Sequence, residues 1–287
     1  MKLAVIVLVV VAISAAIFAF VLQKPSPDEV FNQAIQHALQ TKQFTQKVAV
    51  QGGSSVTLLY DVSDVKNSKV SLVGDISLGG AKLSFESYGD GKNEFLKIKS
   101  FNFSGPDADK YLNKWTQLRK DGAWAGDDAS SLANFLGANS RFLVLGDYIF
   151  GNFSAAEQTE LLKLMSGKKV NDYKTEKVTK DKFDGHDVYV YEVTSNQNAL
   201  KEANKKAAKF MGIPDEDLQI ALSYIGSEST MAKMFVRIDT GQLVKVETEQ
   251  SEMKVTNVYS AYNTTKLPAQ PKPQISYEDF SKYWSNF

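Results

Sequence analysis

The hydrophobic pattern is most uniform at the start of the chain. Residues 3–22 read LAVIVLVVVAISAAIFAFVL, a run without charge in which Ser14 is the only polar side chain. Twenty helical residues rise roughly 30 Å, which is the thickness of the hydrocarbon core of a bilayer. The run therefore predicts an uncleaved anchor with one transmembrane helix. A cleaved signal peptide is the alternative, although apolar residues continue past the small residues at 14–16.

The charges around this run favour one orientation. Lys2 precedes it, and Lys24 follows it with Asp28 and Glu29 close behind. Because positive residues are retained preferentially on the cytoplasmic side, we expect the N-terminus to lie inside the cell. The sequence thus predicts a single-pass cell-membrane protein with the bulk of the chain extracytoplasmic.

Beyond a linker at residues 25–29, apolar residues recur at helical spacing. The six positions are Val30, Phe31, Ala34, Ile35, Ala38 and Leu39. Ser26 can cap this helix, and Pro27 suits its first turn. We expect the stripe to face the core, docking against a partner helix being the alternative. Further helices are predicted at residues 127–137, from Ser154 with a capping box to Glu157, at residues 196–212, from Pro214 and from Ser276.

Two other regions alternate between apolar and polar residues with a period of two, which is typical of strands. Residues 44–103 contain five such segments, with glycine-containing hairpin turns at 78–81 and 89–93. Strands return from Tyr173 to Phe183, then after the Asp184-Gly185 turn, and three more lie between residues 231 and 262. This succession predicts an α+β fold with an antiparallel curved sheet rather than the βαβ rhythm of a nucleotide-binding domain.

The middle of the chain is unusually apolar and is well placed to cover one face of this sheet. The residues expected to line an apolar ligand cavity there are Leu132, Phe135, Leu136, Phe142, Leu143, Leu145, Tyr148 and Ile149. A cover and a curved sheet can enclose such a cavity. Plain core packing of the same side chains is the alternative reading.

Composition argues against several classes of function. Lys+Arg and Asp+Glu both number 33, and only three arginines occur, so nothing favours a nucleic-acid partner. The chain has no cysteine, and it contains no G-x-S-x-G, H-E-x-x-H or P-loop motif. We therefore expect no enzyme, no cofactor and no metal site.

The two histidines are the remaining candidates for catalysis. His37 lies off the apolar stripe of its helix and is expected to be solvated. His186 lies in KFDGHDVYVYEVT, where Asp184-Gly185 predicts a hairpin turn and Tyr189 and Tyr191 share one strand face. A structural or solvated role is favoured for His186 over a catalytic one. An unrecognised hydrolase built around it is a third, weaker hypothesis.

Three passages resemble the LolA/LolB/LppX-type superfamily. They are FDGHDVYVYEVT at residues 183–194, FVRIDTGQLVKVETE at 235–249 and VTNVYSAYNTTKLPAQP at 255–271. The resemblance implies an open half-barrel covered by helices. Several members carry lipids or lipidated proteins across an extracytoplasmic space, which implies a lipid, acyl chain or lipoprotein as the ligand. The chain departs from the anchored members because it lacks their lipid-modified cysteine and keeps a membrane helix instead.

Together these patterns predict a membrane-anchored, extracytoplasmic binding protein for an apolar ligand. The predicted parts are an anchor with its flank at residues 1–24, the linker at 25–29, a LolA-like ectodomain at 30–267, and a proline-rich link with a short C-terminal helix at 268–287. The competing hypothesis is a non-catalytic interaction or structural ectodomain whose interior is fully packed.

Overall fold

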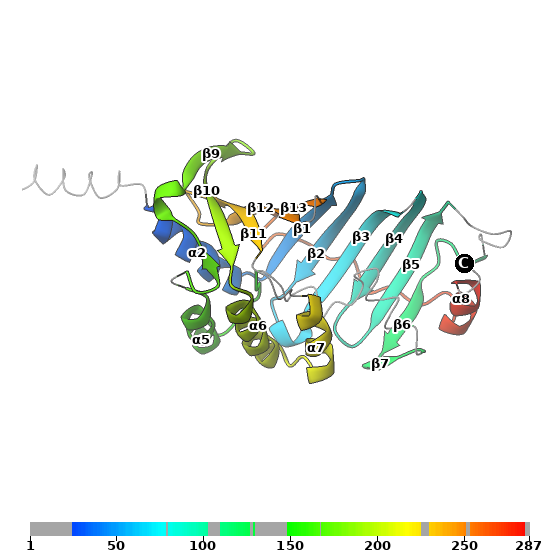
Figure 1. Cartoon of the computed structure of the whole chain (residues 1–287). Helices are drawn as coiled ribbons and strands as arrows, with labels where there is room; N and C mark the ends of the chain where they lie inside the picture. Colours follow the sequence, from blue (N-terminus) through cyan, green and yellow to red (C-terminus); the bar gives the residue numbers. More distant parts are fainter. Residues whose placement is uncertain are drawn as a thin grey trace, which may run out of the picture.

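The computed structural model describes residues 25–78, 80–102, 110–126, 129, 148–166, 168–224, 230–250 and 253–284. They form a single curved sheet of 13 strands, and every pair of neighbouring strands is antiparallel (Figure 1). The predicted open antiparallel sheet with a few helices is thereby confirmed. The predicted anchor at residues 3–22 and most of the helix predicted at 127–137 lie outside the described residues. Within the described part of the chain, no helix is long and apolar enough to cross a membrane.

The strand order places the first strand in the middle of the sheet. It runs β7-β6-β5-β4-β3-β2-β1-β13-β12-β11-β10-β8, with β9 paired to β10. The strands are β1 (Gln43–Val50), β2 (Ser54–Asp61), β3 (Lys69–Leu78), β4 (Ala81–Gly89), β5 (Glu94–Phe101), β6 (Thr116–Lys120), β7 (Ala123–Trp124), β8 (Asn171–Asp172), β9 (Thr179–Phe183), β10 (His186–Ser195), β11 (Met231–Arg237), β12 (Leu243–Gln250) and β13 (Met253–Ser260). The last strand, β13, pairs with the first, so that Thr45 lies opposite Ser260.

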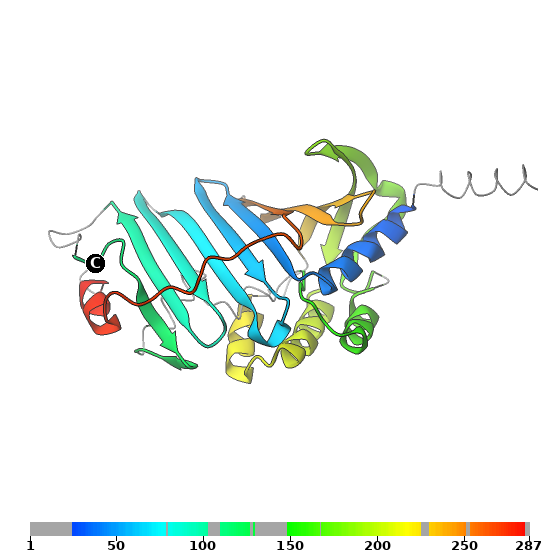
Figure 2. The ribbon, with the colours of Figure 1, turned by 180° about the vertical axis from the view of Figure 1, so that it is seen from behind.

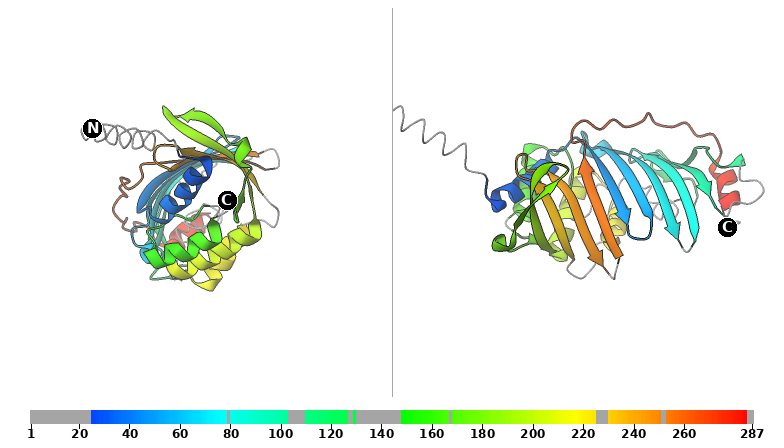
Figure 3. Two further views of the ribbon diagram at one scale, coloured as in Figure 1. Left: turned by 90° about the vertical axis from the view of Figure 1, so that its left-hand side faces the viewer. Right: turned by 90° about the horizontal axis from the view of Figure 1, so that it is seen from above.

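The described helices gather on the concave side of the sheet, with one further helix at its far edge. They are α2 (Pro27–Leu39), α5 (Ala155–Met165), α6 (Gln197–Met211), α7 (Asp215–Tyr224) and α8 (Tyr277–Trp284), with the 3-10 turns η1 (Val65–Asn67) and η3 (Thr175–Lys177). Seen end-on, the sheet arches over α5, α6 and α7 (Figure 3). Helix α2 contacts β11, while α8 contacts β6 at the opposite end of the sheet.

The predicted helix boundaries are confirmed where the structure describes them. Ser26 and Ser154 each close a capping box, with Glu29 and Glu157 as their respective partners. All six residues of the predicted apolar stripe are buried. Gly212 ends α6 with φ 67°, a left-handed conformation in which glycine avoids the strain of a Cβ atom.

The C-terminal link crosses the back of the sheet. From the end of β13 it runs behind β1 to β5 and reaches α8 beyond β5 (Figures 2 and 3). Thr45 Oγ1 lies 3.0 Å from Thr265 Oγ1, which joins the link to β1. At the far end, Ile275 forms a parallel bridge with Thr116, and Phe280 of α8 is buried in the core.

The Asp184-Gly185 hairpin is confirmed, whereas the continuous strand predicted before it is wrong. Asp184 and Gly185 have φ values of 50° and 77°, as a tight turn with two left-handed residues requires. Upstream, the chain forms the short β8, the 3-10 turn η3 and then β9. The physical reason is a long-range contact: the Tyr173 and Thr175 side chains both donate hydrogen bonds to Asp28, which holds this segment against the start of α2.

Candidate functional site

The concave face of the sheet is apolar over most of its width. Its inward side chains belong to one continuous core cluster, which includes Leu58, Tyr60, Val70, Leu72, Leu83, Phe85, Leu96, Ile98 and Leu118 from β2 to β6. Phe85 lies over Gly74 of the neighbouring strand, where an added Cβ would come within 2.6 Å of its ring. Leu72, Ser87 and Leu96 lie side by side across β3, β4 and β5. This face is the surface on which an apolar ligand would lie.

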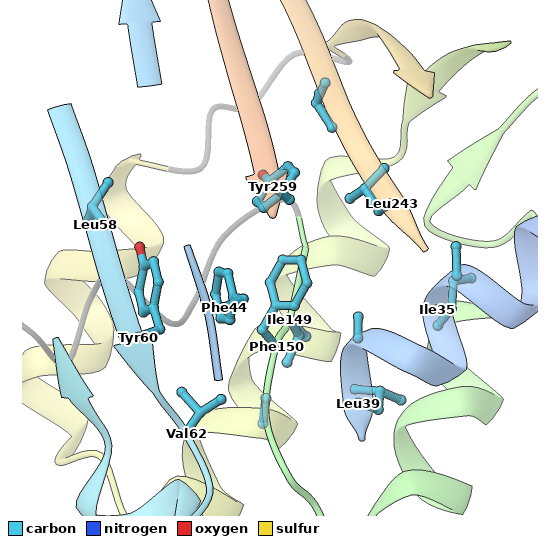
Figure 4. Packing of buried hydrophobic residues seen from close by; sticks show 14 of the residues in the cluster. Ile35, Leu39, Phe44, Leu58, Tyr60, Val62, Ile149, Phe150, Leu243 and Tyr259 are labelled. Atoms are coloured by element: carbon cyan, nitrogen blue, oxygen red, sulfur yellow. The ribbon is translucent and has the colours of Figure 1, made fainter. Parts of the chain in front are cut away.

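An aromatic stack fills the interior near the middle of the sheet (Figure 4). Phe44 lies between Tyr60 and Phe150, with ring centroids 4.2 Å and 4.3 Å away. Phe150 in turn contacts Tyr259 of β13, at 5.3 Å between centroids. Strands β1 and β13 therefore meet Phe150 through direct ring contacts, and β2 joins the stack through the contact between Tyr60 and Phe44.

Two of the eight predicted cavity residues lie in this region. Ile149 is fully buried beside Phe150, and Tyr148 packs against the same core cluster while partly exposed. Backbone hydrogen bonds from Gly151 to Ala38 and from Phe153 to Leu39 fix the segment that follows against the end of α2. The other six, Leu132, Phe135, Leu136, Phe142, Leu143 and Leu145, lie outside the described residues. Their role in a cavity remains a prediction.

A tyrosine cluster, formed by Tyr173, Tyr189, Tyr191 and Asp28, holds the start of α2 against β10. Tyr191 Oη donates to the carbonyl of Pro27 at 2.7 Å, and Tyr189 Oη donates to that of Pro25 at 3.2 Å. Tyr173 Oη donates to Asp28 Oδ1 at 2.7 Å. Each of these hydroxyls has a partner.

The same contacts explain the titration of the cluster. The hydrogen bond from Tyr173, together with Thr175 and Lys168, keeps the pKa of Asp28 below its usual value. Burial raises the pKa of Tyr173, and the neighbouring carboxylate of Asp28 raises it further. Burial is also the main cause of the raised pKa of Tyr191. Tyr173 and Tyr191 therefore keep their hydroxyls protonated, and Asp28 keeps its carboxylate charged, across the physiological range.

An arginine cluster, formed by Glu94, Arg119 and Asp217, lies at the other end of the interior. Glu94 and Arg119 are opposite each other on β5 and β6. Arg119 Nη2 lies 3.5 Å from Asp217 Oδ2 of α7, and both side chains are only 4% exposed. The Arg119 Nε donates to the carbonyl of Gly122 at 2.9 Å, and its Cζ lies 4.8 Å from the centre of the Trp124 ring.

Sequence reasoning missed the arginine cluster. In the sequence, Arg119 is one of only three arginines, and Asp217 falls within the helix predicted from Pro214. The strand β6 is short, and its register shifts beside Phe95, so simple alternation does not place Arg119 on the inner face. The rarity of arginine in the chain is the one feature of the sequence that could have drawn attention to Arg119.

The predicted roles of the histidines fit their positions. His37 is exposed on α2, and His186 is exposed where β10 begins opposite Phe183. His186 lines a hollow of about 620 Å³ together with Lys47, Asp184 and Arg237. Arg237 is already paired in that hollow, because it donates two hydrogen bonds to Asp239. Among the described residues, no group of three His, Cys, Asp or Glu side chains could hold a metal ion.

Comparison with known sequences gives no relative. No model of a known protein family matches the chain. A search of curated proteins also returns no match. The fold must therefore be compared through structures alone.

Solved structures do match. LprF from Mycobacterium bovis aligns with a TM-score of 0.50 and 10% identity, covering 86% of this chain and 99% of that one. The Mycobacterium tuberculosis lipoprotein LppX aligns at 0.42 with 11% identity, covering 84% and 97%. MucB aligns at 0.33 with 13% identity, covering 87% and 62%. The likeness to LprF over almost its whole length confirms the expected LolA/LolB/LppX-like fold.

Proposed function

We propose that this protein is a non-catalytic binding protein that holds an apolar ligand, such as a lipid, an acyl chain or a lipoprotein, against the concave face of its sheet. The observation that carries the proposal is the largely apolar inner face from β2 to β6, which includes Leu58, Leu72 and Leu96. An apolar site with a few polar groups is the usual form of a small-molecule pocket. The half-barrel fold shared with LprF supports the same reading.

The proposal includes a membrane anchor at residues 3–22 and an extracytoplasmic location for the rest of the chain. The length and apolar composition of that run support the anchor. A permanently tethered protein cannot shuttle between membranes, so a receptor, acceptor or membrane-side adaptor suits it better than a free carrier. Sequencing the N-terminus of the mature chain tests this part, because a chain that begins after Ala16 would show a cleaved signal peptide.

A fully packed interaction protein is the second candidate. The observation that favours it is the complete burial of Phe85 and Leu96 on the inner face. A closed, well-packed interior would leave no volume for a ligand. The protein would then act through its surface alone.

One substitution separates the two candidates. Ser87 is buried between Leu72 and Leu96 on the inner face, so Ser87→Leu adds volume where a ligand would lie. With a ligand cavity, the variant folds with near-normal stability and loses its lipid. With a packed interior, overpacking costs about 1–3 kcal/mol in the free energy of unfolding. Val73→Leu, at the neighbouring exposed position, is the matched control.

The readout is native mass spectrometry of the full chain, purified from its host membrane in mild detergent. A bound lipid on the wild type and the Val73→Leu control, absent from Ser87→Leu, would support ligand binding. Repeated recovery of an empty wild-type protein, combined with a destabilised Ser87→Leu variant, would replace it with the packed alternative.

A further inference from the structure

An open groove between α5 and α6 is rich in lysine. The two helices pack against each other, and the groove between them has a volume of about 700 Å³. Leu164 lines it together with six charged side chains, which are Lys163, Lys205, Lys206, Lys209, Glu160 and Glu202. The chain as a whole has a net charge of zero, so this groove concentrates positive charge on one part of the surface.

Both glutamates of the groove already have a lysine partner. Lys206 pairs with Glu160 across the two helices, and Lys205 Nζ lies 2.8 Å from Glu202 Oε1 within α6. Lys163 and Lys209 are exposed, and neither forms an ion pair within the described part of the chain. The hydrogen bond from Lys206 is the main cause of the lowered pKa of Glu160, and the charges of Lys163 and Lys209 lower it further. The groove therefore keeps an excess of positive charge.

The C-terminal end of α5 lies close to the start of α2, at the same end of the molecule (Figure 1). Lys169 Nζ donates a hydrogen bond to the carbonyl of Lys163 at 2.8 Å. The preceding residue, Lys168, places its Nζ 4.0 Å from Asp28 Oδ1 in the first turn of α2. The positive surface of the groove thus continues from α5 towards the point where the described chain begins.

The chain that precedes α2 limits how far this surface can lie from a membrane. Pro25 follows Leu22, the last residue of the apolar run at 3–22, by three residues. Three extended residues span at most about 11 Å. Tyr189 Oη holds Pro25 to the domain by a hydrogen bond to its carbonyl at 3.2 Å. With the apolar run in a bilayer, as proposed above, this end of the domain lies at the membrane surface.

The chemistry of the groove fits an anionic membrane surface better than a protein partner. Its charged donors are all lysines, which act as flexible point charges towards phosphate groups. Lysines close to a bilayer are attracted to anionic lipids without any fixed geometry. Protein interfaces rely instead on buried aromatic and arginine side chains, and the lining of this groove contains neither.

We propose that the groove between α5 and α6, extended by Lys169, docks on the anionic surface of the membrane that holds residues 3–22. This inference rests on the anchor in the proposed function and is independent of the apolar ligand. The contact adds a second attachment to the anchor. It holds the domain in one orientation relative to the bilayer, where a single short linker would let it swing.

The test is lysine acetylation of the full chain reconstituted in lipid nanodiscs, read residue by residue by mass spectrometry. One set of nanodiscs contains phosphatidylcholine alone, and the other contains equal parts of phosphatidylcholine and phosphatidylglycerol. We expect Lys163 and Lys209 to react about fivefold more slowly in the anionic nanodiscs, which is the attraction expected for one lysine near such a surface. Lys120, which is exposed on β6 at the opposite end of the sheet, should react equally in both.

Salt provides a second check on the same samples. At about 1 M salt the Debye length falls to about 3 Å, so the difference between the two kinds of nanodisc should disappear. The chain itself should remain in the nanodiscs, because the anchor is held by its apolar residues rather than by charge.

A double variant removes the excess charge and leaves both ion pairs intact. With Lys163→Gln and Lys209→Gln, the remaining lysines of the groove, Lys205 and Lys206, are each paired with a glutamate. We expect Lys205 to lose its protection by anionic lipid in this variant, while the melting temperature stays unchanged because the substituted side chains are exposed. Lys92→Gln with Lys120→Gln, also exposed, is the matched control and should keep the protection of Lys205.

Each contrary result overturns a different part. Equal acetylation of Lys163 and Lys209 in the two kinds of nanodisc would disprove the docking while leaving the anchor in place. Protection by soluble polyglutamate but not by anionic nanodiscs would assign the groove to an acidic protein partner instead. A chain that leaves the nanodiscs at about 1 M salt would remove the proposed anchor, and the docking geometry with it.

Discussion

The interior of this protein carries polar side chains at two ends, and the two ends differ in how fully their hydrogen bonds are made. In the tyrosine cluster, the hydroxyls of Tyr173, Tyr189 and Tyr191 all donate to groups at the start of α2. In the arginine cluster, Arg119 is held by Gly122 and Asp217 and still has one unbonded nitrogen. Complete hydrogen bonding stabilises the contact between α2 and β10, whereas the arginine cluster leaves one buried donor without a partner in the described part of the chain.

The largest expected effect comes from breaking the buried ion pair. Asp217→Ala leaves the Arg119 guanidinium buried without its carboxylate partner, which should cost about 3–5 kcal/mol in the free energy of unfolding. Urea denaturation measures the loss. Glu202→Ala, which removes the exposed pair with Lys205, is the control and should leave stability unchanged. Equal losses in the two variants would show that Arg119 is solvated after all.

A smaller effect is expected in the tyrosine cluster. Tyr191→Phe keeps the ring and removes the hydroxyl that bonds the Pro27 carbonyl at 2.7 Å. A lost buried hydrogen bond of this kind should cost about 1–2 kcal/mol, again measured in urea. Tyr189→Phe, whose bond to Pro25 is longer at 3.2 Å, should cost less. The reverse order would mean that the hydroxyl of Tyr189, not that of Tyr191, fixes the start of α2.

The smallest effect is a pH dependence at Asp28. Its pKa is lowered in the folded state, chiefly by the Tyr173 hydroxyl, so its contribution to stability is fully present above the unfolded value near 3.8. That contribution is lost as the pH falls through the lower folded value. Unfolding curves from pH 5 to pH 2 should therefore converge for the wild type and Asp28→Asn. Parallel curves over this range would exclude the linkage.

At alkaline pH, the tyrosines of the same cluster change the free energy of unfolding in the opposite direction: stability falls as the pH rises. Burial raises the pKa of Tyr173 and of Tyr191 above the ordinary value of about 10. Above about pH 10 the unfolded tyrosines ionise first, so stability falls as the pH rises further. Tyr191→Phe should reduce this loss, which circular dichroism melts from pH 8 to pH 11 can measure.

Sequence periodicity was sufficient for most of the fold. The Asp184-Gly185 turn, the capping box of Ser154 and Glu157 and the shared face of Tyr189 and Tyr191 all follow from local rules, because each depends on residues close together in the chain. The short segment after Tyr173 could not be predicted this way. Its shape depends on Asp28, 145 positions away from Tyr173.

The arginine cluster could not be predicted from the sequence for the same reason. Arg119 becomes notable only when β5 brings Glu94 and α7 brings Asp217 to its side. Neither neighbour is close in the chain, and the register shift near Phe95 hides the inward direction of Arg119. A site assembled from three elements leaves no pattern in any one of them.

The pairing of the first strand with the last has a consequence for synthesis of the chain. β1 lies in the middle of the sheet, yet its partner β13 leaves the ribosome about 200 residues later, since Thr45 pairs with Ser260. Until then, the edge of β1 that later pairs with β13 stays unpaired, and it can associate with other chains. The nascent chain can cover this edge only after its C-terminal strand has been synthesised. C-terminal truncations that remove β13 should therefore accumulate as insoluble protein rather than as a smaller folded domain.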